Sequence, residues 1–131
     1  MSWIKKAATE APQEFIDGYL ECALWTSDDS EEGRGEFLDA TFGIRDIAPE
    51  SMQKAVEECN QFYAANSKDL DSVENMGKAG HDFWLTRNGH GAGFWEKSDY
   101  EEEMGKRLTE SSKSFGEKLL YVGDDGKLYF S

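Results

Sequence analysis

Residues 81–95 read His-Asp-Phe-Trp-Leu-Thr-Arg-Asn-Gly-His-Gly-Ala-Gly-Phe-Trp, and this stretch decides the fold that the sequence predicts. Asn88-Gly89 lies between two runs rich in aromatic residues, which is the strongest short-range signal for a β-hairpin. A two-residue turn there places Trp84 opposite Gly93, where the indole ring covers bare backbone and so supports a glycine within a strand. We therefore expect an aromatic hairpin whose tip is Asn88-Gly89.

Two helices are predicted ahead of this hairpin. Pro12 is compatible with a helix start near Thr9–Ala11, because proline is favoured in the first turn. Apolar residues at helical spacing follow it: Phe15, Ile16, Tyr19, Leu20 and Ala23. The second helix is expected from Pro49 to near Asn66, with the most regular apolar period in the chain. Residues 67–79 either add a weak helical turn or wrap the core.

A third helix is predicted after the aromatic hairpin, over residues 98–115. Ser98 at the N-cap and Glu101 three residues later match a capping box. The apolar stripe of this helix is narrow, which predicts packing at the edge of the fold. Gly116 is a natural stop for the helix.

A second hairpin is predicted from Leu119 to Phe130, turning at Asp125-Gly126 and placing Val122 opposite Tyr129. The order of elements is then helix, helix, hairpin, helix, hairpin. This order predicts an α+β fold, with about three helices packed on a small antiparallel sheet made of two β-hairpins. The length fits a single domain over residues 1–131.

The net charge of −13 is concentrated in the first half of the chain. Residues 10–76 hold 17 Asp and Glu against 4 Lys and Arg, whereas residues 77–131 hold 10 against 8. Such a field repels nucleic acid and anionic membranes and attracts basic protein surfaces. No signal peptide or transmembrane stretch is recognised, and Trp3-Ile4-Lys5-Lys6 is too short and polar to be one. We expect a cytoplasmic protein that contacts neither nucleic acid nor membrane directly.

The two cysteines, Cys22 and Cys59, fall at apolar positions of the predicted helices. Buried thiols in a reducing compartment are favoured over a disulfide.

His81, Asp82 and His90 are candidates for metal binding and for catalysis. In the predicted hairpin, nine residues at about 3.3 Å each separate the two histidines, so they cannot share an ion. A catalytic interpretation makes His90 a general base beside Arg87, which would hold an anion. The chain has no nucleophile motif and no glycine-rich loop that opens a helix. We therefore expect no catalytic residue, no metal and no cofactor.

The aromatic hairpin is equally compatible with a binding surface and with a purely structural role. Tryptophan and arginine are enriched at interface hot spots. The candidate binding residues here are Trp84, Arg87, Asn88, His90 and Trp95. In the structural alternative, Arg87 and His90 are a solvated cross-strand pair.

A second candidate surface is the acidic stripe of the first helix, formed by Glu10, Glu14, Asp17 and Glu21. Successive carboxylates are about 4.5–6 Å apart along the axis, against roughly 7 Å between phosphates of one DNA strand. Mimicry of a nucleic-acid backbone is therefore one hypothesis, and a simple solvated face is the other.

The run from Gly80 to Trp95, together with Leu-Tyr-Val-Gly-Asp-Asp-Gly-Lys at 120–127, resembles a family of short acidic proteins encoded by bacteriophages. Asp-Ile-Ala-Pro-Glu-Ser at 46–51 and Ala-Leu-Trp at 23–25 fit the same pattern. The resemblance implies a phage accessory product acting in the cytoplasm of a bacterial host. Small acidic phage proteins often bind and block a host enzyme, frequently a nuclease or another defence factor. The resemblance carries over no functional residue.

The leading hypothesis is a non-enzymatic phage accessory protein that binds a basic surface of a host protein and inhibits or modulates it. The first alternative is a small-ligand, nucleotide-binding protein that uses the 81–95 stretch. The second alternative is an enzyme of unknown reaction. A homo-oligomer is compatible with each of them.

Overall fold

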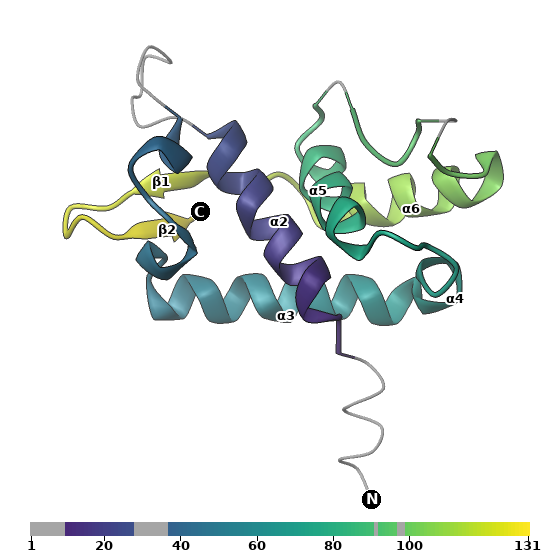
Figure 1. The fold of residues 1–131 in the computed structure, drawn as a ribbon, viewed down its shortest axis with the longest axis horizontal. Coiled ribbons are helices and arrows are strands. Elements are labelled where there is room, and N and C mark those ends of the chain that lie inside the picture. The colour runs from purple at the N-terminus through teal and green to yellow at the C-terminus, as the bar shows by residue number, and fades with distance from the viewer. Residues whose placement is uncertain (1–9, 28–36, 91, 97–98) are drawn as a thin grey trace, which may run out of the picture.

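The computed structural model describes residues 10–27, 37–90, 92–96 and 99–131. The elements in chain order are α2 (Gln13–Thr26), η1 (Leu38–Ala40), η2 (Ile44–Asp46), α3 (Pro49–Ala65), α4 (Ser67–Leu70), α5 (Met76–Arg87), α6 (Glu102–Ser114), β1 (Leu120–Val122) and β2 (Leu128–Phe130). Figure 1 shows α2 crossing the middle of the molecule, with the β-hairpin towards one end, α6 towards the other and α3 along one side. The predicted α+β class is confirmed. The predicted arrangement is only roughly matched, because the described chain has five α-helices and one hairpin.

The first two predicted helices are confirmed. α2 begins at Gln13, later than the predicted start near Thr9–Ala11, because Pro12 is its N-cap and not a residue inside the helix, and its predicted apolar face is buried. α3 begins at Pro49 and ends at Ala65, one residue before the predicted end. Proline at the first position of a helix has no amide hydrogen that needs a partner, which explains why Pro49 marks the start so clearly.

The hairpin predicted at residues 81–95 is wrong, because residues up to Arg87 belong to α5. The side chain of Asn75 caps this helix by accepting a hydrogen bond from the amide of Lys78 at 3.0 Å. Ala79, Phe83 and Trp84 follow at helical spacing and are buried. The helical period therefore extends through the aromatic run that was assigned to a strand.

The Asn88-Gly89 pair ends α5 instead of turning a hairpin. Gly89 has a φ of +69°. Its amide donates to the carbonyl of Thr86 at 3.2 Å, and the amide of His90 donates to the carbonyl of Leu85 at 3.0 Å. These two hydrogen bonds define a Schellman motif, a common C-terminal cap that requires a left-handed residue. A type I′ turn also requires left-handed backbone, so the same dipeptide is compatible with both structures.

The second hairpin is confirmed, with its register shifted by one residue. Tyr121 pairs with Tyr129, and Val122 pairs with Leu128 instead of the predicted Tyr129. The loop holds three residues, 124–126, because the amide of Gly123 donates to the carbonyl of Lys127 at 2.7 Å. The last loop residue has a φ of +83°, which is typical of three-residue hairpin loops.

The third predicted helix is present as α6, with a later start than predicted. Glu101 is its N-cap, and the carboxylate of this residue accepts the amide of Glu103 at 3.1 Å. The predicted capping box is therefore wrong in its placement of Glu101, and Ser98 lies outside the described residues. Gly116 follows the helix with a φ of +78°, so the predicted stop is confirmed.

α2 and α5 cross with their backbones in contact, because glycines lie at the crossing. A Cβ atom at Gly18 would overlap the carbonyl oxygen of Gly77. A Cβ atom at Gly80 would overlap the carbonyl oxygen of Phe15 and would lie 2.8 Å from the amide nitrogen of Tyr19. This crossing brings the aromatic side chains of the two helices into one core.

The core is built around stacked aromatic rings. Phe62 of α3 and Phe83 of α5 stack with their ring centroids 4.1 Å apart, and Phe15 of α2 stacks against both rings. Cys22 and Cys59 are buried free thiols, as predicted. Burial raises the pKa of the Cys22 thiol to about 12, so the group stays protonated and unreactive near neutral pH.

Substitution of Gly80 tests the helix crossing. Gly80→Ala gains about 1 kcal/mol of helix propensity, but the added methyl group meets backbone atoms that cannot move aside. Overpacking of this kind costs about 1–3 kcal/mol, so we expect a net loss of unfolding free energy in urea titrations. Gly43→Ala is the matched control, because a Cβ atom there meets nothing within 4 Å. Equal stability of the two variants would contradict the crossing.

Candidate functional site

The structure separates the five residues predicted to form one binding surface at the aromatic hairpin. Trp84, Asn88 and His90 line one hollow. Arg87 lies in the core, and Trp95 lies against α6. Any function that needs all five side chains on one ligand is therefore not compatible with this fold.

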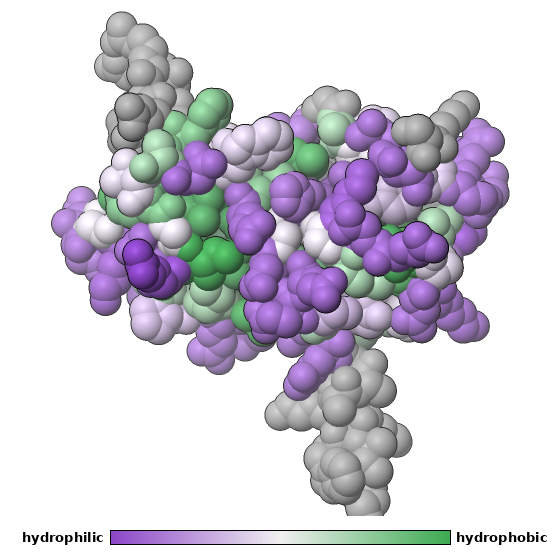
Figure 2. Space-filling view, viewed as in Figure 1, coloured by the Kyte–Doolittle hydropathy of each residue, from purple (hydrophilic) through white to green (hydrophobic). Residues whose placement is uncertain are grey.

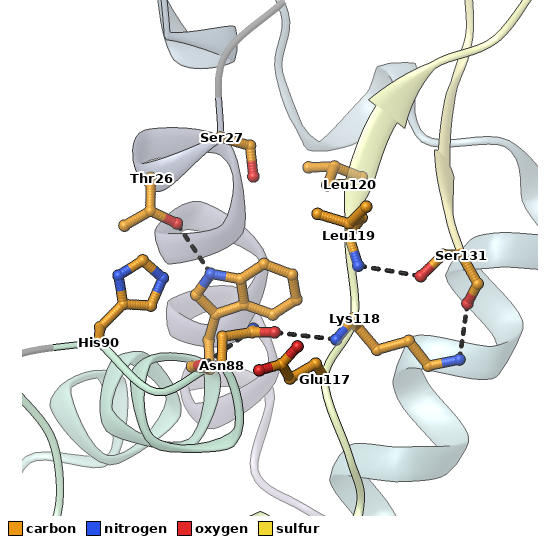
Figure 3. A pocket seen from close by; sticks show the side chains of 10 residues that line it. Thr26, Ser27, Asn88, His90, Glu117, Lys118, Leu119, Leu120 and Ser131 are labelled. Atoms are coloured by element: carbon orange, nitrogen blue, oxygen red, sulfur yellow. Dashed lines mark hydrogen bonds between the residues drawn. The ribbon is translucent and has the colours of Figure 1, made fainter. Parts of the chain in front are cut away.

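The hollow lies between the C-terminal ends of α2 and α5 and the segment that leads into β1 (Figure 3). Its volume is about 600 Å³. The indole nitrogen of Trp84 donates to the hydroxyl of Thr26 at 2.8 Å, which joins the two helix ends. The side-chain oxygen of Asn88 accepts the amide of Lys118 at 2.8 Å, which fixes the opposite wall.

Several polar groups of the hollow already have partners within the fold. The ammonium of Lys118 donates to the carbonyl oxygen of Ser131 at 2.7 Å. The hydroxyl of the same serine accepts the amide of Leu119 at 3.0 Å. His90 is exposed at the margin, and among the described residues no hydrogen bond joins its imidazole to a nucleophile or an orienting carboxylate. These polar groups are therefore used for contacts within the fold, and the exposed imidazole of His90 lies beside them.

Arg87 of α5 is 2% exposed, and its guanidinium donates to groups of α2, of α3 and of the segment that follows α6. It donates to the carboxylate of Glu58 at 2.7 Å and to the hydroxyl of Tyr19 at 3.0 Å. It also donates to the carbonyls of Phe115 at 2.9 Å and Gly116 at 2.8 Å. Burial raises the pKa of Tyr19 above its usual range, so the hydroxyl stays neutral beside the cation. The interpretation of Arg87 as a surface group that holds a ligand is not compatible with this burial.

The residues weighed for metal binding do not converge. Asp82 is 2% exposed, and its carboxylate accepts hydrogen bonds from the Lys78 ammonium at 2.8 Å and the Tyr100 hydroxyl at 2.6 Å. His81 lies beside Trp25 of α2, with the ring centroids 6.5 Å apart. Within the part of the chain that the structure describes, no three His, Cys, Asp or Glu side chains are placed to hold a metal ion.

The predicted acidic stripe lies on the outer face of α2. Glu10, just ahead of the helix, and Glu14 and Glu21 within it are exposed, and Asp17 is half-buried. The prediction missed Trp25, which continues the stripe four residues after Glu21 and is 57% exposed. Extending the same helical spacing by one step would have found this residue.

Comparison of the chain with protein-family models, curated proteins and solved structures finds no match. Among the described helices, none is long and apolar enough to cross a membrane.

Substitutions at Arg87 and His90 test the different roles that the structure gives them. Arg87→Met leaves the Glu58 carboxylate and two carbonyls without their donor, which should lower the unfolding free energy by about 3 kcal/mol. His90→Ala removes an exposed side chain and should change the unfolding free energy by less than about 0.5 kcal/mol. Urea unfolding followed by circular dichroism measures both. Similar values for the two variants would show that Arg87 is not a structural residue.

Proposed function

We propose that this protein is a non-enzymatic accessory protein that binds a basic surface of a host protein through the outer face of α2. The observation that carries the proposal is that the exposed acidic stripe of α2 ends on an exposed tryptophan, Trp25. The sequence resemblance suggests a bacteriophage product acting in a bacterial cytoplasm. Binding would inhibit or modulate the host protein, with host nucleases and other defence factors as the favoured class.

The stripe has the dimensions of a compact contact site. Glu14, Asp17, Glu21 and Trp25 follow one another at intervals of three or four residues, so they share one side of the helix. At about 1.5 Å per residue the set spans about 16 Å. Figure 2 shows hydrophilic residues over the middle of this face, where α2 lies in Figure 1, and a hydrophobic area beside them on the side of the hairpin.

The carboxylates of the stripe differ in their contacts from the carboxylates that form ion pairs within the fold. Among the described residues, Glu58, Asp69 and Asp82 form short ion pairs with arginine or lysine. None of the ion pairs formed among the described residues involves a carboxylate of the stripe. Asp17 accepts a hydrogen bond from the side chain of Gln13 at 2.8 Å, and Glu10, Glu14 and Glu21 are exposed. Exposed carboxylates of this kind would attract and orient a basic partner. Trp25 would supply the apolar anchor that such a contact needs, because tryptophan is enriched at hot spots.

The row of carboxylates along one side of the helix also supports the mimicry hypothesis. Neighbouring members are about 4.5–6 Å apart along the helix axis, whereas one DNA strand carries a phosphate about every 3.4 Å of its axis, so the stripe resembles the strand as a row of negative charge and not in its exact spacing. We therefore favour a partner whose basic surface ordinarily binds nucleic acid.

A nucleotide-binding function has less support from the geometry. It would use the hollow at Asn88 and His90, where Trp84 is only 2% exposed and offers no free ring face for a base. Arg87, the residue expected to hold a phosphate, is enclosed by the core.

A comparison of two charge-reversal variants tests the proposal. The first carries Glu14→Lys, Asp17→Lys and Glu21→Lys. The control carries Glu103→Lys, Glu117→Lys and Asp124→Lys, at exposed positions on α6, after α6 and in the loop of the β-hairpin. Both variants change the net charge by the same amount, so any difference in binding between them comes from the positions of the reversed charges. Each is used as bait in a host bacterial lysate, and retained proteins are quantified by mass spectrometry.

We expect the native protein and the control to retain the same basic host protein and the stripe variant to lose it. Trp25→Ala should weaken that binding about tenfold or more, as expected for a hot spot. Raising the salt from about 0.1 M to about 1 M shortens the screening length from roughly 10 Å to roughly 3 Å and should release the partner. Retention by the stripe variant, or equal loss with the control, would contradict the proposal.

A further inference from the structure

A second pocket lies on the other side of α5, between the Phe94–Trp95 turn and α6. Its volume is about 330 Å³. It is separate from the acidic stripe of α2, and none of its lining residues belongs to that helix. The function proposed for α2 does not depend on it.

The walls of this pocket are aromatic. Phe94 and Tyr100 are buried and meet edge to face, with their ring centroids 5.2 Å apart. Trp95 is 40% exposed and forms the outer wall. Gly105 completes the floor, because a Cβ atom there would lie 2.6 Å from the carbonyl oxygen of Phe94. The turn can therefore lie directly against the first half of α6 and enclose an apolar space.

The rim of the pocket is acidic. Glu101, Glu102 and Glu110 are exposed around it, and Lys106 is the one basic residue among its described lining. Three carboxylates and one ammonium leave a charge of −2 at the mouth. The N-terminus of α6 contributes the equivalent of about +0.5, which is too small to offset this charge. The mouth therefore favours a cation.

We propose that this pocket binds a small aromatic amine, with its flat ring against the exposed ring of Trp95 and its ammonium at the acidic rim. An apolar enclosure with charged groups only at the mouth selects a ligand with an apolar body and one charged end. The volume lies near the lower end of the roughly 300–1,000 Å³ found for ligand sites, which fits a single ring on a short chain.

An NMR titration of the full chain with three probes of similar shape tests the proposal. The probes are 2-phenylethylamine, 2-phenylethanol and 3-phenylpropionate, which are cationic, neutral and anionic. The indole N–H signal of Trp95, assigned with Trp95→Phe, reports occupancy of the pocket. The variant Glu102→Gln with Glu110→Gln removes two rim charges at constant shape. Glu57→Gln with Glu74→Gln is the control at exposed positions away from the pocket. Thermal unfolding by circular dichroism checks that each variant is folded.

We expect the amine to shift the Trp95 signal saturably, the alcohol to bind about fivefold more weakly, and the carboxylate to give no measurable shift. The rim variant should weaken amine binding about fivefold, which is the size of an exposed ion pair, and leave alcohol binding unchanged. The control variant should bind all three probes as the native protein does. Non-saturating shifts at Trp95, equal affinity for the three probes, or undiminished amine binding by the rim variant would each overturn the proposal.

Discussion

The buried guanidinium of Arg87 is the interaction on which the arrangement of the four longest helices depends. Moving a cation out of water costs several kcal/mol unless its donors are satisfied. Here the N–H donors of Arg87 form hydrogen bonds with Tyr19 of α2, Glu58 of α3 and the backbone that follows α6. All of these partners must be in place together, so the position of α5 is fixed relative to its neighbours.

The packing around this cation determines what the surface can offer. α2 is held by α5 at the glycine crossing and by the aromatic core on its inner side. Only one side of the helix remains open to solvent, and that side carries the carboxylates and Trp25. The acidic stripe is therefore the side of α2 that packing leaves exposed among the described residues, and the exposed Trp25 lies on the same side.

Elements that are specified by nearby residues were predicted correctly from the sequence. The prediction was wrong where one short motif is compatible with two different structures. α2 and α3 follow from apolar period and proline position, and the second hairpin follows from Asp125-Gly126. The Asn88-Gly89 pair was misassigned because a Schellman cap and a type I′ turn both need left-handed backbone. Only the three-dimensional packing distinguishes them. The pairing register also depended on the length of the loop, which the dipeptide does not fix.

The candidate site was predicted less well, because partners distant in sequence decide burial. Arg87 and Trp84 have the residue types of an exposed binding surface, yet their hydrogen-bond partners lie up to 68 residues away in the chain. The spacing of side chains within residues 81–95 therefore gives no information about those partners. The acidic stripe was predicted correctly as an outer face of the first helix, since helical spacing alone defines it. Its binding role stays a proposal.

Hydrogen exchange of the Arg87 side chain, measured by NMR on the Nε–H group, tests whether the guanidinium is enclosed and held by its partners. Arg107 is the internal reference, because it pairs with Asp69 at the surface and its side chain is 56% exposed. We predict that the Nε–H of Arg87, which donates to the carbonyl of Gly116, exchanges far more slowly than that of Arg107. Exchange of the two groups at similar rates would show that the guanidinium is open to water, and would contradict the account of the fold given above.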